Sequence, residues 1–187
     1  MKVAIIGGIG SGKSSVISLL ASYGERVCDC DEIYRQICEL PMYIQLIQDK
    51  FGAIKDGKID KKSLAEIVFA DKEKLQALNS LAHPLVFEEI DKIYKESDRN
   101  LFIEVSAFDI EMKDYFDEIV FVRSQKSTRI ERVKSRNGFD ENYVLSIMSK
   151  QMSDEEMESI SDFVVVNDGD IGALESQVEW ILQWLDK

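Results

Sequence analysis

The sequence predicts an α/β fold in which a parallel sheet of five strands is flanked by helices. Short apolar runs alternate with helical patterns along the chain, and the runs are apolar almost throughout, as expected of strands covered on both faces. A glycine-rich segment also joins the first run to the first helix. The predicted strands span residues 2–6, 26–28, 101–105, 119–122 and 163–166.

The first predicted strand leads into a phosphate-binding loop. Residues 7–14 match the pattern G-x-x-x-x-G-K-[ST], and a helix is predicted over residues 14–23, closed by Gly24. Glycines let successive backbone N–H groups turn inward around phosphates, and the helix adds its positive N-terminal end. Lys13 would reach the β- and γ-phosphates, and Ser14 would ligate Mg²⁺. The alternative is a glycine-rich turn, but the strand before it and the helix after it favour the loop.

Two aspartates follow the second predicted strand, which lies at residues 26–28. A carboxylate at the carboxyl end of a parallel strand faces the crevice in which open α/β sheets bind ligands. Asp31 would therefore accept a proton from an attacking hydroxyl, or help to hold Mg²⁺ through water. The alternative is that Asp29 or Asp31 caps the helix that begins near Glu32. Because one aspartate suffices for a cap, we expect a chemical role for at least one of them.

The middle of the chain has a different pattern. Residues 41–97 read as helices alone, with a turn at residues 52–57 and a break at His83-Pro84, which predicts an inserted helical domain for a second substrate. We expect a core formed by residues 1–40, 98–122 and 159–187, a helical acceptor domain at residues 41–97, and a lid at residues 123–158. A C-terminal helical stripe with two tryptophans beside it is interpreted as core packing; it comprises Leu174, Val178, Ile181, Leu182 and Leu185, with Trp180 and Trp184.

A basic segment precedes the last predicted strand. The net charge of −12 disfavours nucleic acid as a partner, so a phosphorylated ligand must meet a local positive cluster. That cluster comprises Arg123, Lys126, Arg129, Arg132, Lys134 and Arg136. The spacing places the arginines at 129, 132 and 136 on one face of a helix over residues 124–135, which ends at Asn137-Gly138. With a second helix at residues 141–151 this predicts a lid over phosphates, whereas the alternative is a solvated helix face.

Composition limits the class of protein. With 187 residues and 45% hydrophobic residues, the chain suits one domain with small inserted subdomains. The sequence has no membrane span or signal peptide, so we expect a cytoplasmic protein without a membrane partner. Three cysteines, Cys28, Cys30 and Cys38, are expected to be buried thiols, because metal binding would need more ligands than His83 supplies. No guanine-reading Asn-Lys-x-Asp motif exists, so an ATP-dependent kinase of small molecules fits better than a GTPase.

Several segments together resemble the dephospho-CoA kinase family. The resemblance covers essentially the whole chain, with the motifs in family order and at family spacing. It rests on the loop at residues 7–14, Val27-x-Asp29-x-Asp31-x-Ile33-x-Arg35, Leu78-x-x-x-x-His83-Pro84-Leu85-Val86, Arg132-x-x-x-Arg136, Gln151, and Ser161-Asp162-Phe163-Val164-Val165-x-Asn167-x-Gly169.

The resemblance implies a P-loop kinase fold and a reaction. The enzyme would transfer the γ-phosphate of ATP, with Mg²⁺, to the ribose 3′-hydroxyl of dephospho-CoA, the last step of coenzyme A synthesis. Asp31, Lys13 and Arg136 would be catalytic, and Asp31, Arg35 and His83 would contact the acceptor, although His83 with Pro84 would equally serve as a helix break. The metal would be held by Ser14, Asp31 and Glu104. The nucleotide would contact Gly8, Ile9, Gly10, Ser11, Gly12, Lys13, Ser14, Ser15, Arg132 and Asn167.

Some positions depart from the family pattern. The departures are Ile6 for a threonine, Ser106-Ala107-Phe108 for Pro-Leu-Leu, Asn137 for an aspartate, Met157 for a lysine or arginine, and Glu104 for an aspartate. The departures at Ile6, Ser106 and Met157 keep open a catalytically weak ATP-binding switch. The alternative enzyme is another small-metabolite or nucleoside kinase of the same fold. Retention of Asp31 and Lys13 argues against the switch. We expect a monomer, with at most weak self-association.

Overall fold

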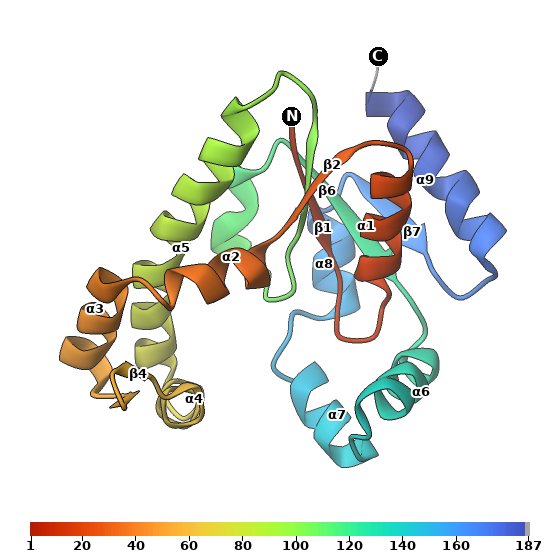
Figure 1. The fold of residues 1–187 in the computed structure, drawn as a ribbon. Helices are drawn as coiled ribbons and strands as arrows, with labels where there is room; N and C mark the ends of the chain where they lie inside the picture. The colour runs from red at the N-terminus through yellow and green to blue at the C-terminus, as the bar shows by residue number, and fades with distance from the viewer. Residues whose placement is uncertain (186–187) are drawn as a thin grey trace. The chain divides into compact units, whose positions relative to one another are not determined.

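The computed structural model describes residues 1–185, which form two compact units (Figure 1). One unit combines residues 1–29 with the chain from Asp98 onward, and the other comprises residues 30–97. The first unit contains β1 (Lys2–Ile6), α1 (Lys13–Ser22), β2 (Arg26–Asp29), β5 (Leu101–Glu104), the 3₁₀ helix η1 (Ile110–Tyr115), β6 (Glu118–Arg123), α6 (Lys126–Asn137), α7 (Glu141–Met148), α8 (Asp154–Ile160), β7 (Phe163–Val166) and α9 (Ile171–Leu185).

The second unit is helical with one small hairpin. It contains α2 (Cys30–Ile37), α3 (Pro41–Phe51), β3 (Ile54–Lys55), β4 (Lys58–Ile59), α4 (Lys61–Phe69) and α5 (Lys72–Lys95). The sequence places the boundary after residue 40, whereas α2 groups with this unit. Ile33 and Ile37 give α2 a buried face, and α2 packs on α5.

The sheet of the first unit is parallel, and its strand order is β2-β5-β1-β6-β7. The predicted fold class is therefore confirmed. The central strand β1 pairs with β5 and β6, so that Ile5 lies between Glu104 and Val120 in register. Strand bounds differ from the predicted ones by a residue at most: β5 ends at Glu104, one residue early, and β6 extends from Glu118 to Arg123.

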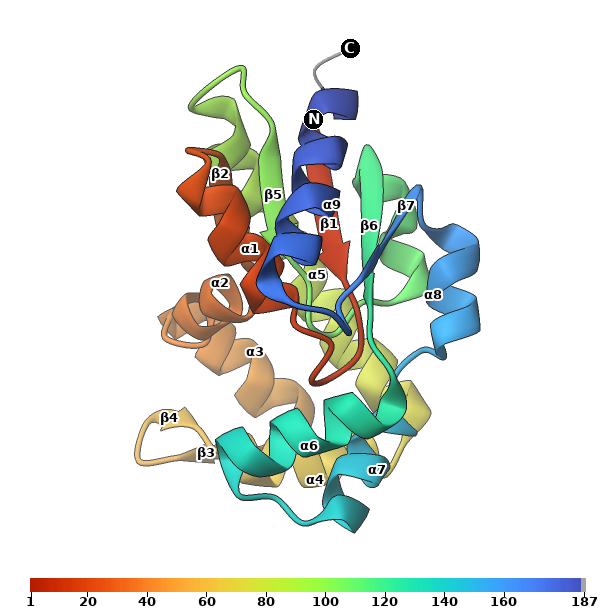
Figure 2. The same cartoon turned by 90° about the vertical axis from the view of Figure 1, so that its right-hand side faces the viewer.

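Helices α1 and α9 lie on the same face of the sheet (Figure 2). Alternate residues of a strand point to opposite faces, so Val3 and Ile5 face these helices while Ala4 and Ile6 face the other side, and all four are buried. The predicted apolar stripe of the C-terminal helix lies in this core, with Leu174, Val178, Ile181 and Leu185 buried and Leu182 packed against them.

The sequence predicts that both tryptophans of α9 pack in the core, and this prediction is wrong. Trp180 and Trp184 are exposed, and both make edge contacts with the ring of Phe163 at the start of the edge strand β7. The physical reason is position: at helical spacing they stand beside the stripe, and β7 has no further strand next to it to cover them.

Helices α6 and α7 lie at the end of the sheet at which the loop after β1 lies, as both views show (Figures 1 and 2). Helix α6 begins two residues later than predicted and ends at Asn137, followed by the C-cap residue Gly138, whose φ of 68° lets its N–H reach the carbonyl of Lys134. The second helix ends at Met148 and not at residue 151. A separate helix, α8, then begins at a capping box formed by Ser153 and Glu156.

The predicted turn at residues 52–57 is the centre of a two-stranded hairpin, in which Ile54 pairs with Ile59. Asp56 and Gly57 both have positive φ, at 51° and 75°, as two-residue hairpin turns require. The Asp-Gly dipeptide was the sequence signal for this hairpin, which the helices-alone interpretation missed.

The predicted break at His83-Pro84 is wrong, because α5 continues through Pro84. Proline removes one backbone donor and costs a helix interior about 3 kcal/mol. Val86 and Ile90 are buried beyond it, and burying such side chains stabilises the fold by about 1.5–3 kcal/mol each. Tertiary packing therefore outweighs the local preference.

Two further properties bear on the expected class of protein. None of the helices in the described part of the chain combines the length and apolar character that a membrane span requires. Cys28, Cys30 and Cys38 are half-buried thiols that do not form disulfides with one another, and burial raises the pKa of the Cys28 thiol to about 12, with the nearby charge of Asp29 acting in the same direction. Cys28 is therefore protonated and unreactive at neutral pH.

Candidate active site

The loop between β1 and α1 has the backbone geometry of an anion site. Gly10 and Gly12 have φ values of 78° and 95°, in the left-handed region that favours glycine. Gly12 occupies the N-cap of α1 and, as a glycine, has no side chain to cap the first N–H groups of that helix. These N–H groups and the positive end of the helix dipole are available to a phosphate.

Lys13 supplies the positive charge of the loop. Its side chain is buried, and its Nζ donates to the carbonyl of Gly7 at 2.8 Å, across the loop from the start of α1. A buried ammonium that donates to a backbone carbonyl can exchange this hydrogen bond for a stronger one to a charged acceptor such as a phosphate oxygen.

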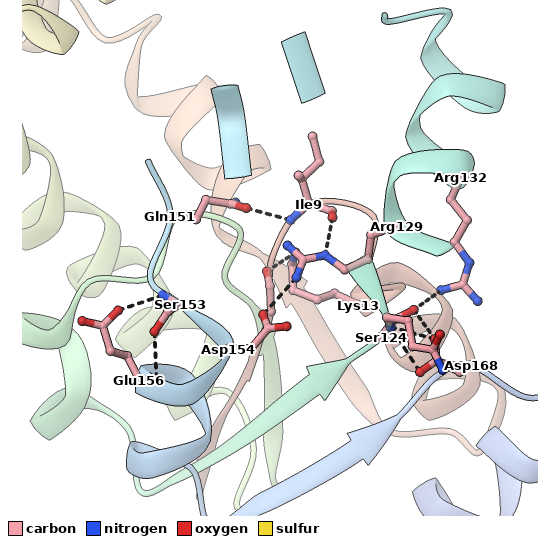
Figure 3. A network of polar contacts seen from close by, with 12 residues as sticks. Ile9, Lys13, Ser124, Arg129, Arg132, Gln151, Ser153, Asp154, Glu156 and Asp168 are labelled. Carbon is pink, nitrogen blue, oxygen red and sulfur yellow. Dashed lines mark hydrogen bonds and ion pairs between the residues drawn. The ribbon is translucent and has the colours of Figure 1, made fainter. Parts of the chain in front are cut away.

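The far side of the loop is held by the end of β7. Asn167 is buried, and its Nδ2 donates to the carbonyl of Ser11 at 2.8 Å. Arg132 donates to the carbonyl of Asn167 at 2.9 Å and to Ser124 Oγ at 3.3 Å. The base of α6 is fastened in turn by Asp168, which accepts from Ser124 Oγ at 2.6 Å and from the N–H of Gln125 (Figure 3). The Ser124 hydrogen bond, with that of Gln125 and the charge of Arg132, lowers the pKa of Asp168.

One cavity of about 1030 Å³ opens over the loop, and all of its lining residues belong to the first unit. It is lined by Ile9, Gly10, Gly12, Lys13, Ser14, Ser15, Glu104, Ser106, Glu131, Arg132, Val133, Ser135, Arg136, Ile147, Gln151, Asn167, Gly169, Asp170, Ile171 and Leu174. The cavity thus brings together most of the residues that the sequence predicts for the nucleotide, with Arg136 and Glu104. Gly8 and Ser11 belong to the loop without lining the cavity, and Ser11 Oγ is buried with no hydrogen-bond partner among residues 1–185.

The residues predicted for the acceptor belong to the second unit. Asp31 lies in the first turn of α2, two residues after β2 ends at Asp29, and not at the strand end itself. Arg35 is exposed on the same helix, where it pairs with Glu32 at 2.7 Å. His83 lies on α5 against the ring of Phe87. At the strand end, Asp29 is in register with Glu104 of β5, which lines the cavity.

The cavity offers oxygen donors of the kind that Mg²⁺ prefers. Ser14 contributes a hydroxyl and Glu104 a carboxylate. Within residues 1–185, no group of three or more histidine, cysteine, aspartate or glutamate side chains could hold a metal by itself. This donor set suits a kinase metal, because Mg²⁺ in such sites is bound by few protein groups together with phosphate oxygens and water.

The departures from the family pattern fall into two groups. Ile6 and Met157 are buried, on β1 and α8, and take part in packing. Ser106 lines the cavity, and Asn137 Oδ1 accepts from Nε of Arg136 at 2.9 Å, so these two positions are at the site.

Sequence reasoning assigned no role to several residues around the cavity. Gln151 accepts from the N–H of Ile9 at 2.9 Å, and Arg129 donates to the carbonyl of Ile9 at 3.0 Å (Figure 3). In the sequence, Arg129 belongs to the basic segment and Gln151 to the residues that resemble the family, but no contact of either residue with the loop is predicted. Ile171 and Leu174 form an apolar part of the wall. In the sequence, Leu174 is marked only by its place in the apolar stripe, and Ile171 only by its place at the start of the last helix.

Gly12 gives a prediction specific to the loop. A Cβ on Gly12 would lie 1.9 Å from Nδ2 of Asn167, in addition to the strain of a φ of 95°. Gly24 has a φ of 82° with open space around the same position, so Gly24→Ala is a matched control for the strain alone, about 1–2 kcal/mol. We expect Gly12→Ala to lose more stability in urea titration than Gly24→Ala, and to raise the KM for ATP about tenfold or more. Equal behaviour of the two variants would contradict the assignment of Gly12 to the site.

Together these features define a class of protein. A phosphate loop at the carboxyl end of the central strand, a buried lysine and two arginines from a helical hairpin surround one cavity. Phosphoryl transfer is catalysed mainly by such positioning and by cations that meet the charge of the transferred group. The fold and the site therefore define a P-loop phosphotransferase.

Comparison with known proteins specifies the family. The family model for dephospho-CoA kinase matches residues 1–173. Dephospho-CoA kinases of Carboxydothermus hydrogenoformans and Fusobacterium nucleatum are 36% and 33% identical, over 98% and 96% of this chain and 95% of each relative. The chain belongs to the dephospho-CoA kinase family, and it is an ATP-dependent kinase.

Solved structures agree on the fold. A structure from Thermus thermophilus has a TM-score of 0.87 and 29% identity, covering 99% of this chain and 97% of that one. Dephospho-CoA kinase from Campylobacter jejuni has a TM-score of 0.69 at 23% identity, covering 99% and 98%. Shikimate kinase from Aquifex aeolicus has a TM-score of 0.54 at 21% identity, covering 100% and 96%, which extends the likeness to the P-loop kinase fold in general.

Proposed function

We propose that this kinase transfers the γ-phosphate of ATP to the ribose 3′-hydroxyl of dephospho-CoA and so produces coenzyme A. The observation that supports it most is that the loop, Lys13, Arg132 and Arg136 line the same cavity. Its volume, about 1030 Å³, lies at the upper end of ligand pockets of roughly 300–1,000 Å³ and has room for a nucleoside triphosphate. We further expect a monomer that works in the cytoplasm, which size-exclusion chromatography and cell fractionation would check.

The triphosphate would lie along the loop. The N–H groups at the start of α1 would bind the phosphates, and Lys13 would exchange the carbonyl of Gly7 for oxygens of the β- and γ-phosphates. The adenine would lie toward Asn167 and the apolar wall of Ile171 and Leu174, because a base needs an apolar surface and the phosphates do not.

Two arginines would meet the charge of the transferring group. Arg132 donates to neutral acceptors, including the carbonyl of Asn167 and Ser124 Oγ, and these hydrogen bonds leave its positive charge in place beside the loop. Arg136 is exposed to the cavity near the end of α6, where its planar fork could bind phosphate oxygens in pairs.

Mg²⁺ would be held by Ser14 and, through water, by Glu104 and Asp31, and when bound it would neutralise charge on the phosphates. The protein residues then perform the transfer by orientation. The 3′-oxygen attacks the γ-phosphorus, the bond from that phosphorus to the β–γ bridging oxygen breaks, and ADP leaves.

Asp31 would take the proton of the 3′-hydroxyl, with Arg35 and His83 as contacts to the acceptor. The support for Asp31 is its place directly after β2, whose last residue pairs in register with Glu104 of the cavity. A carboxylate that follows the carboxyl end of a parallel strand so closely in the chain is suited to a general base.

Asp31→Asn tests this assignment. The amide keeps the shape of the side chain but cannot take the proton, so kcat should fall by about 10² to 10⁴, while MgATP affinity measured by calorimetry should change little. Asp29→Asn is the matched control, since it changes the same residue type two positions earlier. If Asp29→Asn is the inactive variant and Asp31→Asn turns over normally, the base is Asp29; if both remain active, the segment only caps α2.

The choice of hydroxyl can be tested with an analogue. Dephospho-CoA that lacks the 3′-hydroxyl should bind as an inhibitor competitive with dephospho-CoA and should give no phosphorylated product. Phosphorylation of the 3′-deoxy analogue at a rate similar to that of dephospho-CoA would contradict the proposed acceptor group.

A further inference from the structure

Ile9, the third residue of the phosphate loop, is held at both of its peptide groups. The N–H of Ile9 donates to Oε1 of Gln151 at 2.9 Å, and its carbonyl accepts from Nε of Arg129 at 3.0 Å (Figure 3). Both partners come from far along the chain, Arg129 from α6 and Gln151 from the segment between α7 and α8. The conformation of the loop at Ile9 is therefore set by side chains and not by the loop sequence alone.

Arg129 is built into the protein as a buried, paired cation. Its side chain is 8% exposed, and its NH1 donates to Oδ1 of Asp154 at 2.9 Å, at the start of α8. The planar guanidinium can hold a carbonyl with Nε and a carboxylate with a terminal nitrogen at the same time, which an ammonium at one point cannot do. The ion pair fixes the guanidinium, and the fixed guanidinium holds the loop.

The loop backbone packs directly against this arginine. A Cβ on Gly8 would lie 1.9 Å from NH2 of Arg129, and a Cβ on Gly10 would lie 2.6 Å from the carbonyl oxygen of Arg129. Only glycine allows so close an approach on both sides of Ile9. The close approach of Arg129 therefore explains Gly8, and it adds to the positive φ as an explanation of Gly10.

The contact has a consequence for the peptide between Ile9 and Gly10. In a trans peptide the C=O and the N–H point in opposite directions, so a carbonyl turned to Arg129 turns the N–H of Gly10 away from it. Ile9 and Gly10 line the cavity, and Arg129 does not. Such an arrangement would keep the carbonyl oxygen, which repels a phosphate, off the nucleotide side and would leave the N–H of Gly10 as a donor there.

We propose that Arg129 is a positioning residue that fixes the Ile9–Gly10 peptide with its N–H toward the phosphates of ATP. It acts through the loop backbone and does not contact the nucleotide. The proposal rests on the proposed function to the extent that the cavity binds ATP; it adds a residue that the phosphate-loop motif does not contain.

The test compares Arg129→Met, which removes both donors, with Arg129→Lys, which keeps one. The measurements are the KM for ATP, the KM for dephospho-CoA, kcat, MgATP affinity by calorimetry and the melting temperature. Arg129→Met should raise the KM and the dissociation constant for ATP about tenfold or more, the effect of one charge-assisted hydrogen bond, and change the KM for dephospho-CoA less than about twofold. Arg129→Lys should recover part of the ATP affinity.

Arg99→Met is the matched control. Arg99 also donates to a backbone carbonyl, that of Gly24, and also approaches a carboxylate, that of Glu25, but near the amino ends of the strands. This variant should keep the ATP affinity of the unchanged protein, whatever its melting temperature. Asp154→Asn should affect ATP affinity less than Arg129→Met, because the hydrogen bond to Ile9 remains.

The outcomes separate the proposal from its alternatives. If Arg129→Met lowers the melting temperature but leaves ATP affinity unchanged, Arg129 is merely structural and the proposal is overturned. Should Arg129→Met fail to fold, Arg129→Lys decides, since unaltered ATP affinity in that variant would also overturn it. Calorimetry with MgATP needs no acceptor, so it tests the role of Arg129 independently of the acceptor. The proposed function fails separately, if the protein without substitutions does not phosphorylate dephospho-CoA.

Discussion

Replacing Arg136 by alanine is expected to lower kcat by a factor on the order of 10³ or more, the effect of removing an arginine that meets the charge of a transferring phosphoryl group. Arg136 lines the cavity near the C-terminal end of α6, with Nε bonded to Asn137. Because it is exposed, its loss should leave the melting temperature nearly unchanged. The measurement is steady-state turnover at saturating MgATP and dephospho-CoA.

Two further variants distinguish the guanidinium from the helix end that carries it. Arg136→Lys should recover only part of the rate, because an ammonium cannot reproduce the planar pair of donors. Asn137→Ala removes the partner of Nε but keeps the arginine, so its kcat should stay within a few-fold of the unchanged protein. If Arg136→Ala turns over as fast as the unchanged protein, the hairpin of α6 and α7 is a solvated surface and not a lid.

Replacing Lys13 by alanine is expected to lower kcat by about 10² to 10³ or more, because the phosphates lose the cation that the buried loop supplies. The loss of its hydrogen bond to Gly7 should cost about 1 kcal/mol of stability, so the variant should remain folded. Lys13→Arg should also be impaired, since the side chain is buried and a larger planar guanidinium does not reproduce the position of the ammonium.

Lys2→Ala is the matched control for Lys13→Ala. Lys2 lies on β1 at the end opposite the loop, where its Nζ stands 3.7 Å from the centre of the Tyr115 ring. Its replacement removes a cation from the strand that leads into the loop, and it should leave kcat unchanged. A folded Lys13→Ala variant with the turnover of Lys2→Ala would disprove the loop assignment.

The sheet could be predicted from the sequence because its signal is local. Each strand is a short apolar run, and β1 runs directly into a glycine-rich loop that fits one kind of ligand. The failures arose where tertiary contacts outweigh local preference. Pro84 is accommodated in α5 by burial of Val86 and Ile90, and the exposure of Trp180 depends on β7 being an edge strand.

The site could be predicted only where its residues share a motif. Lys13 and Ser14 follow from the loop, and Arg132 and Arg136 from helical spacing on one face. The contacts of Arg129 and Gln151 with Ile9 join residues 120 and 142 positions apart, and no periodicity in the sequence carries such a pairing. The roles of Asp31, Arg35 and His83 stay predictions.

The proposed kinase activity is tested most directly by incubating the purified protein with MgATP and dephospho-CoA. The acceptor is then analysed by mass spectrometry with fragmentation. The account predicts one added phosphate, on the ribose 3′-oxygen, in amounts equal to the ADP formed. Lys13→Ala in the same assay should form neither product at a comparable rate. ADP formation without a phosphorylated acceptor, or rapid phosphorylation of a different acceptor in place of dephospho-CoA, would contradict it.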